Sequence, residues 1–353
     1  MNITEGDLAR YVTTVWDAGG TDVLLTAGAK PFSRIDGRLI PQDDEVVLDE
    51  ATIERLVLSV MTPTQEATYR RDLELDFTLG FAQRARLRAN AFRQRGAAAL
   101  ALRIIPERIP SFDELGLPQV VRDLAHLPQG LVLFTGPTGS GKSTTLAALI
   151  DSISANRECH ILTIEDPIEY VHRHQMAAVS QREIGTDTLS FGRAMRAALR
   201  EDPDVLLVGE MRDPESIAMA LTLAETGHLV FSTLHTNDTS QALDRIIDAF
   251  PSDQREQIRL QVSASLVAVV AQRLLPKRGG GIVAAFEVMI GTHAVRNLIR
   301  EGKTRQLRNS LTTGQAHGMQ TLEMGLSHLV AIGMVDHDVA AARAIFPGEV
   351  LKA

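Results

Sequence analysis

The sequence predicts an α/β protein, in which a small α+β domain precedes a larger domain built on a mostly parallel sheet. Short apolar runs at 131–134, 160–164, 205–208 and 229–233 alternate with stretches of helical periodicity, the pattern of strands and helices in such a sheet. A glycine-rich motif, GPTGSGKS, follows the first of these runs after one residue. The first 105 residues lack this alternation and contain hairpin-like segments instead.

Composition narrows the class of protein. With 353 residues, 44% of them hydrophobic, the chain is long enough for two domains with their own cores. The net charge of −8 argues against a nucleic-acid partner, which usually meets a basic surface. A single cysteine, Cys159, excludes a disulfide framework and a four-cysteine zinc site. The N-terminus lacks the basic start and following apolar run of a signal peptide. Apolar runs such as 266–271 are too short to span a bilayer, so we expect a cytoplasmic protein.

We predict an N-terminal domain over 1–105, an interdomain linker over 106–118 and an ATP-binding domain over 119–353. The segment FSRIDGRLI is typical of a hairpin that turns at Asp36-Gly37. ARLRANAF alternates, so that Arg88 is expected on the polar face of a strand. The linker segment contains three prolines and no sustained period.

The motif after the first strand predicts a phosphate-binding loop. It fits G-x-x-x-x-G-K-[ST], in which glycines let backbone N–H groups turn toward phosphate oxygens at a helix N-terminus. Lys142 is expected on the β- and γ-phosphates of ATP and the Ser143 hydroxyl on Mg²⁺. The candidate nucleotide-binding residues are Gly136, Pro137, Thr138, Gly139, Ser140, Gly141, Lys142, Ser143 and Thr144.

Polar residues follow the other predicted strands, and ligands bind at the carboxyl ends of the strands of such sheets. Glu165 ends the strand at 160–164, and Gly209-Glu210 ends the next. We expect Glu210 to act on Mg²⁺ and Glu165 to orient or deprotonate the attacking water, although the sequence leaves the two roles interchangeable. Taken singly, each glutamate could instead cap the following helix.

Two histidines, His228 and His235, flank the fourth strand and are counted among the candidate catalytic residues. His235 is expected to sense the γ-phosphate or to lie at a subunit contact. No further ligands accompany either ring, so neither is expected to bind a metal. On the predicted helix SFGRAMRAALRED, the apolar residues Phe191, Ala194, Met195, Ala198 and Leu199 form one face. Another face carries Arg193, Arg196 and Arg200, which we interpret as solvated or as a subunit contact.

These segments carry a family resemblance. GPTGSGKSTT, ILTIEDPIEY, LREDPDVLLVGEMRD and TGHLVFSTLHTND resemble, in order, the Walker A, Asp box, Walker B and His box of the secretion ATPase superfamily. A Walker B strand that ends in Gly-Glu is typical of that superfamily. The resemblance implies a RecA-like P-loop ATPase domain preceded by a PAS-like domain.

A second segment narrows the resemblance to the type IV pilus retraction ATPases, the PilT family. HAVRNLIREGKTRQL is similar to their Ala-Ile-Arg-Asn-Leu-Ile-Arg-Glu signature, with Val295 in place of isoleucine. Residues 272–292 contain no cysteine, unlike the metal subdomain of the assembly and type II secretion ATPases, and we expect the first domain to start near Met1, without the long extension usual in those ATPases. The resemblance implies a homo-hexameric motor that hydrolyses ATP to retract pili and drive twitching motility. Its implied partners are an inner-membrane platform protein and, indirectly, pilin, which places it at the cytoplasmic face of the inner membrane.

In that family, arginines of the N-terminal domain complete the ATP site of a neighbouring subunit. The matching positions are Arg88 and Arg103, which are 103 − 88 = 15 residues apart, as in the family. One departure is TDVLLTAG, which has no histidine where the family reads Ser-Asp-Leu-His-Leu. An accessory, PilU-like retraction ATPase therefore remains an alternative, as do a ring subunit that binds ATP without turnover and a nucleic-acid translocase. Aromatic residues make up only 4% of the chain, which leaves few platforms for stacking bases.

Overall fold

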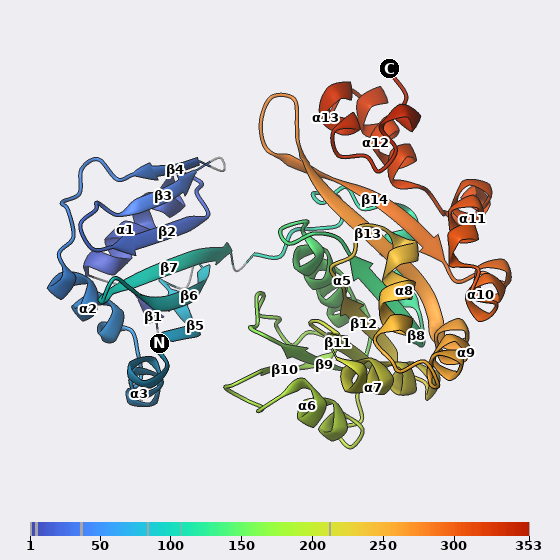
Figure 1. Cartoon of the computed structure of the whole chain (residues 1–353), viewed down its shortest axis with the longest axis horizontal. Coiled ribbons are helices and arrows are strands. Elements are labelled where there is room, and N and C mark those ends of the chain that lie inside the picture. Colours follow the sequence, from blue (N-terminus) through green and yellow to red (C-terminus); the bar gives the residue numbers. More distant parts are fainter. Residues whose placement is uncertain are drawn as a thin grey trace. The chain divides into compact units, whose positions relative to one another are not determined.

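The computed structural model describes residues 2–3, 6–35, 38–82, 85–106, 108–211 and 213–352, and it divides into two compact units (Figure 1). The first unit comprises Met1–Arg108 and Glu169–Val171, and the second comprises Ile109–Ile168 and His172–Ala353. The division falls within the segment 106–118, and Leu117, near its end, is buried in a core of the second unit. The expected turn at Asp36-Gly37 lies outside the described residues.

The first unit contains a seven-stranded sheet in the order β1-β5-β6-β7-β2-β3-β4, which is antiparallel except for the pairing of β1 with β5. Helices α1 and α2 pack on one face of this sheet, where Val12 and Val57 are fully buried in the same core as Leu87 of β6. The elements are β1 (Asn2–Ile3), α1 (Asp7–Asp17), β2 (Asp22–Thr26), β3 (Phe32–Ile35), β4 (Arg38–Pro41), α2 (Glu50–Ser59), α3 (Pro63–Asp72), β5 (Glu74–Phe81), β6 (Ala85–Gln94) and β7 (Ala97–Pro106).

A tight hairpin joins β6 and β7. Its two central residues, Arg95 and Gly96, have φ of 51° and 86°, the positive values that a two-residue turn of the I′ type requires. The turn pairs Gln94 with Ala97, and the ladder that follows places Arg88 directly opposite Arg103. Alternate β6 residues are buried, so the predicted alternation is confirmed, and the two arginines lie on the other face of the sheet.

The second unit contains a seven-stranded sheet in the order β10-β9-β11-β12-β8-β13-β14, parallel except for the edge strand β14. The four strands predicted from apolar runs are confirmed as β8, β9, β11 and β12, and the predicted mostly parallel sheet is confirmed with them. The bounds are β8 (Gly130–Thr135), β9 (His160–Glu165), β10 (Ala178–Glu183), β11 (Val205–Val208), β12 (Leu229–Thr233), β13 (Leu266–Pro276) and β14 (Ile282–Ile290).

Helices cover both faces of this sheet (Figure 1). One face is covered by α4 (Gln119–Arg122) and α5 (Lys142–Asn156), with the 3-10 turn Asp123–His126. The other is covered by α6 (Phe191–Ala198), α7 (Pro214–Glu225), α8 (Thr239–Asp248), α9 (Arg255–Ser265), α10 (His293–Arg300) and α11 (Leu307–Thr313). A smaller core beside β13 and β14 contains α12 (Leu322–Ala331) and α13 (His337–Ala341); further 3-10 turns lie at Thr304–Gln306, Gln315–His317 and Pro347–Glu349.

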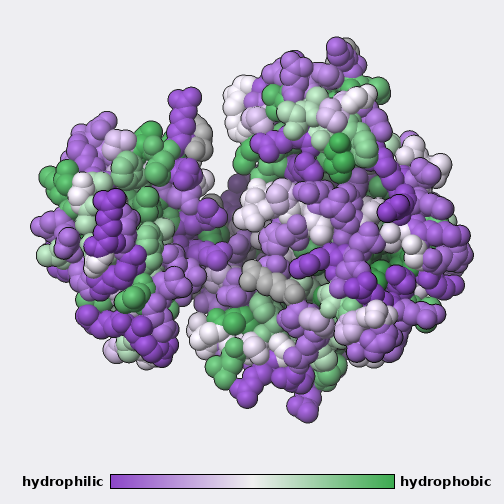
Figure 2. Space-filling model, viewed as in Figure 1, coloured by the Kyte–Doolittle hydropathy of each residue, from purple (hydrophilic) through white to green (hydrophobic). Residues whose placement is uncertain are grey.

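The predicted apolar face of α6 is slightly too wide. Ala194, Met195 and Ala198 are buried, but Leu199 is 49% exposed because it caps the helix instead of continuing it. Outside the cores, hydrophilic residues cover most of the visible face of each unit (Figure 2). Among the described residues, no helix is long and apolar enough to cross a membrane.

Candidate functional site

The phosphate loop leaves the end of β8 and leads into α5, and two of its glycines are required by their surroundings. Gly136 has φ of 141°, and a Cβ there would lie 2.4 Å from the Gln272 carbonyl oxygen of β13. Gly141 has φ of 87°, and its Cβ would lie 2.8 Å from Gln272 Nε2. Because glycine adopts these conformations at little cost, the loop can lie directly against β13.

The polar side chains of the loop are held close to its backbone. Lys142 is only 7% exposed, and its Nζ donates to the carbonyl oxygens of Gly136 at 2.7 Å and Pro137 at 3.2 Å. Ser140 Oγ is buried and, among the described residues, has no hydrogen-bond partner. Ser143, in the first turn of α5, is exposed. The loop therefore combines an inward-folded cation, an unsatisfied hydroxyl and an accessible hydroxyl.

Glu165 ends β9 and is held by hydrogen bonds. Thr163 Oγ1 donates to its Oε1 at 2.7 Å, and Gln181 Nε2 of the edge strand β10 donates to the same oxygen at 3.2 Å. Gly209, at the end of β11, packs against this segment, since a Cβ there would lie 3.3 Å from the Ile164 carbonyl oxygen. The small residue before Glu210 thus permits close approach of the two strand ends.

Glu210 and His235 meet at the ends of β11 and β12. His235 Nε2 lies 3.3 Å from Glu210 Oε2, with 42% of the histidine and 22% of the glutamate side chain exposed. Thr236 is tied to the strand that precedes the phosphate loop, because its Oγ1 lies 2.7 Å from Thr135 Oγ1. Since β8, β9, β11 and β12 are parallel, the loop, both glutamates and His235 share one edge of the sheet.

His228 does not join this group. It precedes β12, so it lies at the amino ends of the parallel strands, the edge opposite the phosphate loop. Its Nδ1 lies 2.9 Å from the Leu223 carbonyl oxygen at the end of α7. His228 and His235 flank the same strand in the sequence. Each residue of a strand advances the chain by about 3.3 Å, so the two histidines lie at opposite ends of β12 and far from each other.

In the first unit, Arg88 and Arg103 belong to a polar row across the sheet. Register pairs Arg34 with Asp22, Asp22 with Arg103, and Arg103 with Arg88 on successive strands. Asp22 Oδ1 accepts from Arg103 Nε at 2.9 Å, and its Oδ2 lies 3.5 Å from Arg34 Nε. These side chains line a pocket of about 360 Å³ together with Val23, Leu24, Leu39, Asp76, Asn90, Ala101 and Leu102.

Sequence reasoning missed three residues that organise these sites. Gln272 is 2% exposed, accepts from Thr145 Oγ1 at 2.9 Å and crowds the loop glycines. Gln181 holds Glu165, and Asp22 holds Arg103. Only Gln272 left a signal in the sequence, as a polar residue that interrupts the long apolar run LVAVVAQRLL.

The donor set fits a magnesium nucleotide. The positive φ of Gly136, Gly139 and Gly141 lets the loop backbone turn tightly, and Lys142 and the α5 N-terminus supply positive charge for phosphate. Ser143 and Glu210 offer a hydroxyl and a carboxylate, the oxygen ligands that Mg²⁺ prefers. The buried Ser140 hydroxyl, which has no hydrogen-bond partner among the described residues, supplies one further polar group within the loop.

Comparison with known proteins agrees with the interpretation of this site as a nucleotide site. The family model described as "Type II/IV secretion system protein" matches residues 28–334. "Type IV pilus retractation ATPase PilT" of Pseudomonas aeruginosa is 47% identical over 329 residues, 93% of this chain and 95% of that protein. "Twitching motility protein" of Neisseria gonorrhoeae is 50% identical over 290 residues, 82% of this chain and 78% of that protein. "Type IV pilus ATPase PilU" of Pseudomonas aeruginosa is 41% identical over 329 residues, which are 93% of this chain and 86% of that protein.

A solved structure matches nearly the whole chain. The crystal structure of the pilus retraction motor PilT with bound ADP superposes with a TM-score of 0.89 at 46% identity, covering 98% of this chain and 99% of that one. The predicted fold class and the family resemblance stated from the motifs are therefore confirmed.

Proposed function

This chain belongs to the type II/IV secretion system protein family, and from this membership we propose that it is a motor ATPase that retracts type IV pili and so powers twitching motility. The observation that carries the proposal is the meeting of the phosphate loop, Glu210 and His235 at one sheet edge, in a chain similar to a PilT along 93% of its length. The identity to PilT exceeds that to PilU, 47% against 41% over the same number of residues, which favours the retraction motor over the accessory enzyme.

The residues of the second unit bind ATP and promote its hydrolysis. The loop amides and Lys142 hold the β- and γ-phosphates, and Ser143 with Glu210 would hold Mg²⁺. Bound Mg²⁺ would neutralise charge on the phosphate oxygens. Glu165, already fixed by Thr163 and Gln181, orients the attacking water and accepts its proton. His235, in contact with Glu210, reports whether the γ-phosphate is present.

The arginines of the first unit complete the site of a neighbouring subunit in a homo-hexamer. Arg88 and Arg103 lie side by side on one sheet face, so they form a single cationic surface. A guanidinium that meets the γ-phosphate neutralises the charge that develops there, as arginine fingers do. Asp22, by holding Arg103, keeps that side chain extended over the face.

The first unit would close over bound ATP and open again after hydrolysis. This cycle would convert ATP turnover into rigid-body motion of the units. The ring would transmit this motion to an inner-membrane platform protein at the cytoplasmic face and, through it, to pilin. Residues His293–Leu307, which match the retraction signature and include α10, are the segment we assign to that output.

The test is ATP turnover of the purified protein beside its Arg88→Ala variant, with the oligomeric state of each measured by light scattering. We expect a hexamer in both cases and a fall in kcat of about 10³-fold in the variant, the scale of an arginine finger. Arg38→Ala, at an exposed position of β4, is the matched control and should turn over ATP like the wild type. Equal turnover by wild type and Arg88→Ala, or full activity of a monomer, would show that the site is not shared.

A further inference from the structure

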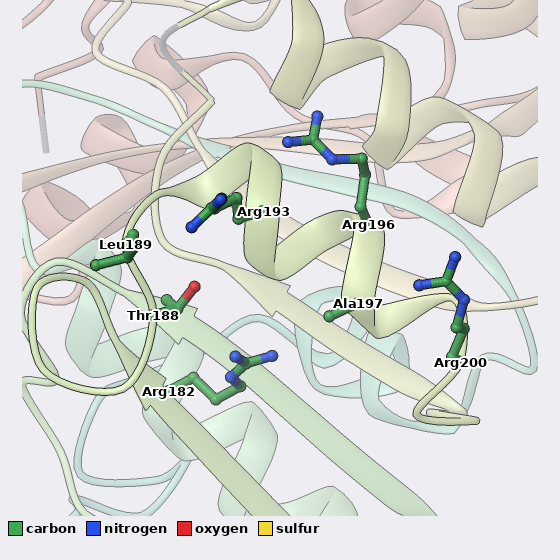
Figure 3. A pocket seen from close by; sticks show the side chains of 7 residues that line it. All are labelled: Arg182, Thr188, Leu189, Arg193, Arg196, Ala197 and Arg200. Atoms are coloured by element: carbon green, nitrogen blue, oxygen red, sulfur yellow. The ribbon is translucent and has the colours of Figure 1, made fainter.

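An open groove of about 660 Å³ lies between β10, the segment that follows it and α6 (Figure 3). Four arginines line it: Arg182 from β10, Arg193 and Arg196 from α6, and Arg200 from just beyond the end of that helix. The remaining lining residues are Thr188, Leu189 and Ala197. In a chain of net charge −8, this is a marked local concentration of positive charge.

Only part of this charge is neutralised within the chain. Arg182 Nη1 lies 2.7 Å from Glu201 Oε1, and Arg196 forms an ion pair with Glu215. The guanidinium groups of Arg193 and Arg200 have no partner in the described part of the chain. The groove therefore presents two cations without a counterion, Arg193 and Arg200, and two that could exchange their glutamate partner for a ligand, Arg182 and Arg196.

We propose that this groove docks an acidic segment of a partner protein. Arg193 and Arg200 are seven residues apart, about 10 Å at the helical rise, which matches carboxylates spaced along a peptide. All four cations are arginines, whose planar fork binds carboxylates in a bidentate manner. Leu189, 72% exposed at the groove, and Leu199, 49% exposed nearby, offer apolar contact beside the charges.

The groove fits a peptide better than a nucleotide or a nucleic acid. None of the described residues that line it is aromatic, so they offer no platform on which a base could stack. A small ligand is usually enclosed over most of its surface, whereas this groove is open and the Arg196 side chain is 56% exposed. Partial exposure of charged side chains around small apolar contacts is typical of a docking surface between proteins.

The groove is connected to the ATP site through β10. Arg182 lines the groove, and its neighbour Gln181 donates to Glu165 at 3.2 Å on the other side of the strand. A segment bound to Arg182 would therefore contact the strand that positions Glu165. Docking at the groove provides a direct route by which a partner could change the rate of hydrolysis.

The experiment uses the full chain and a fluorescein-labelled, glutamate- and leucine-rich peptide, with fluorescence polarisation as the readout. The comparison peptide has glutamine in place of every glutamate. The test variant is Arg193→Glu with Arg200→Glu, and the control is Arg173→Glu with Arg245→Glu, two exposed arginines outside the groove. We expect the wild type and the control to bind the acidic peptide at least about tenfold more tightly than the test variant or the glutamine peptide.

Three results would overturn the proposal. The first is equal affinity of the wild type and the test variant for the acidic peptide, or no preference for that peptide over its glutamine form. The second is loss of the oligomer in the test variant alone, which would make this face a contact between copies of the chain. The third is displacement of the peptide by short duplex DNA or inorganic phosphate at lower concentrations than by unlabelled peptide, since the groove would then be a phosphate site.

Discussion

The tightest packing in the site predicts the effect of a single added methyl group, Gly136→Ala. The new Cβ would lie 2.4 Å from the Gln272 carbonyl oxygen and 2.8 Å from Ser140 Oγ, and the backbone at Gln272 is fixed within β13 by its pairing with Phe286 of β14. The loop itself must therefore move, by about 1 Å, a displacement that can cost about 100-fold in a reaction that depends on positioning. The positive φ of 141° adds about 1–2 kcal/mol of strain, which should lower Tm by about 2–8 °C.

Binding of a fluorescent ATP analogue, kcat/KM and thermal unfolding measure these effects. The matched control is Gly279→Ala, at φ of 82° in the turn between β13 and β14, where no atom of the described residues lies within 4 Å of the added Cβ. We expect the control to lose a similar increment of Tm but to keep its kcat/KM. Wild-type nucleotide affinity in Gly136→Ala, or an equal loss of activity in Gly279→Ala, would refute the argument that Gln272 shapes the loop.

Three further predictions follow from single side chains. Glu165→Gln removes the group that accepts the proton of the attacking water, so it should still bind ATP but lower kcat by about 10²–10⁴-fold, and unchanged steady-state turnover would contradict its role. Asp22→Ala should leave Arg103 without its 2.9 Å partner and lower kcat by about tenfold in an intact oligomer. A rise in KM with unchanged kcat would contradict this role of Asp22. Burial lowers the pKa of His172 from 6.5 to about 4. The free energy of unfolding therefore contains a contribution from the neutral ring that is complete above pH 6.5 and is lost as the pH falls toward 4. The whole contribution is about 3 kcal/mol. His172→Gln should flatten this decline in Tm, and an equally steep profile would exclude the histidine as its cause.

The strands β8, β9, β11 and β12 were predictable because they are buried on both faces and read as continuous apolar runs bounded by polar residues. The strand β10 was not, because it lies at the edge of the sheet. Its sequence, AVSQRE, buries only Val179 and Glu183, so it lacks an apolar run. The groove beside α6 was also missed, because Arg182, which lines it, belongs to β10, and the sequence of β10 contains no apolar run that would predict a strand.

The pairing of Arg88 with Arg103 was within reach of the sequence. The two-residue turn Arg95-Gly96 fixes the register of β6 and β7, and that register places positions 88 and 103 opposite each other. The position of His228 was equally accessible, because residues that precede and follow one strand lie at opposite edges of a parallel sheet. The contacts of Gln272 could not be predicted, since they depend on how β13 packs beside the phosphate loop.

The claim that one site is built from two subunits is tested most directly by mixing two inactive variants. Lys142→Ala removes the phosphate-loop cation and Arg88→Ala removes the arginine supplied to a neighbour. When the two are unfolded together and reassembled in equal amounts, about one site in four should combine an intact loop with an intact arginine. The account therefore predicts recovery of about a quarter of wild-type ATP turnover in the mixed oligomers, against almost none in either variant alone. No recovery in mixed oligomers of confirmed composition would contradict it, because each site would then draw both residues from the same chain.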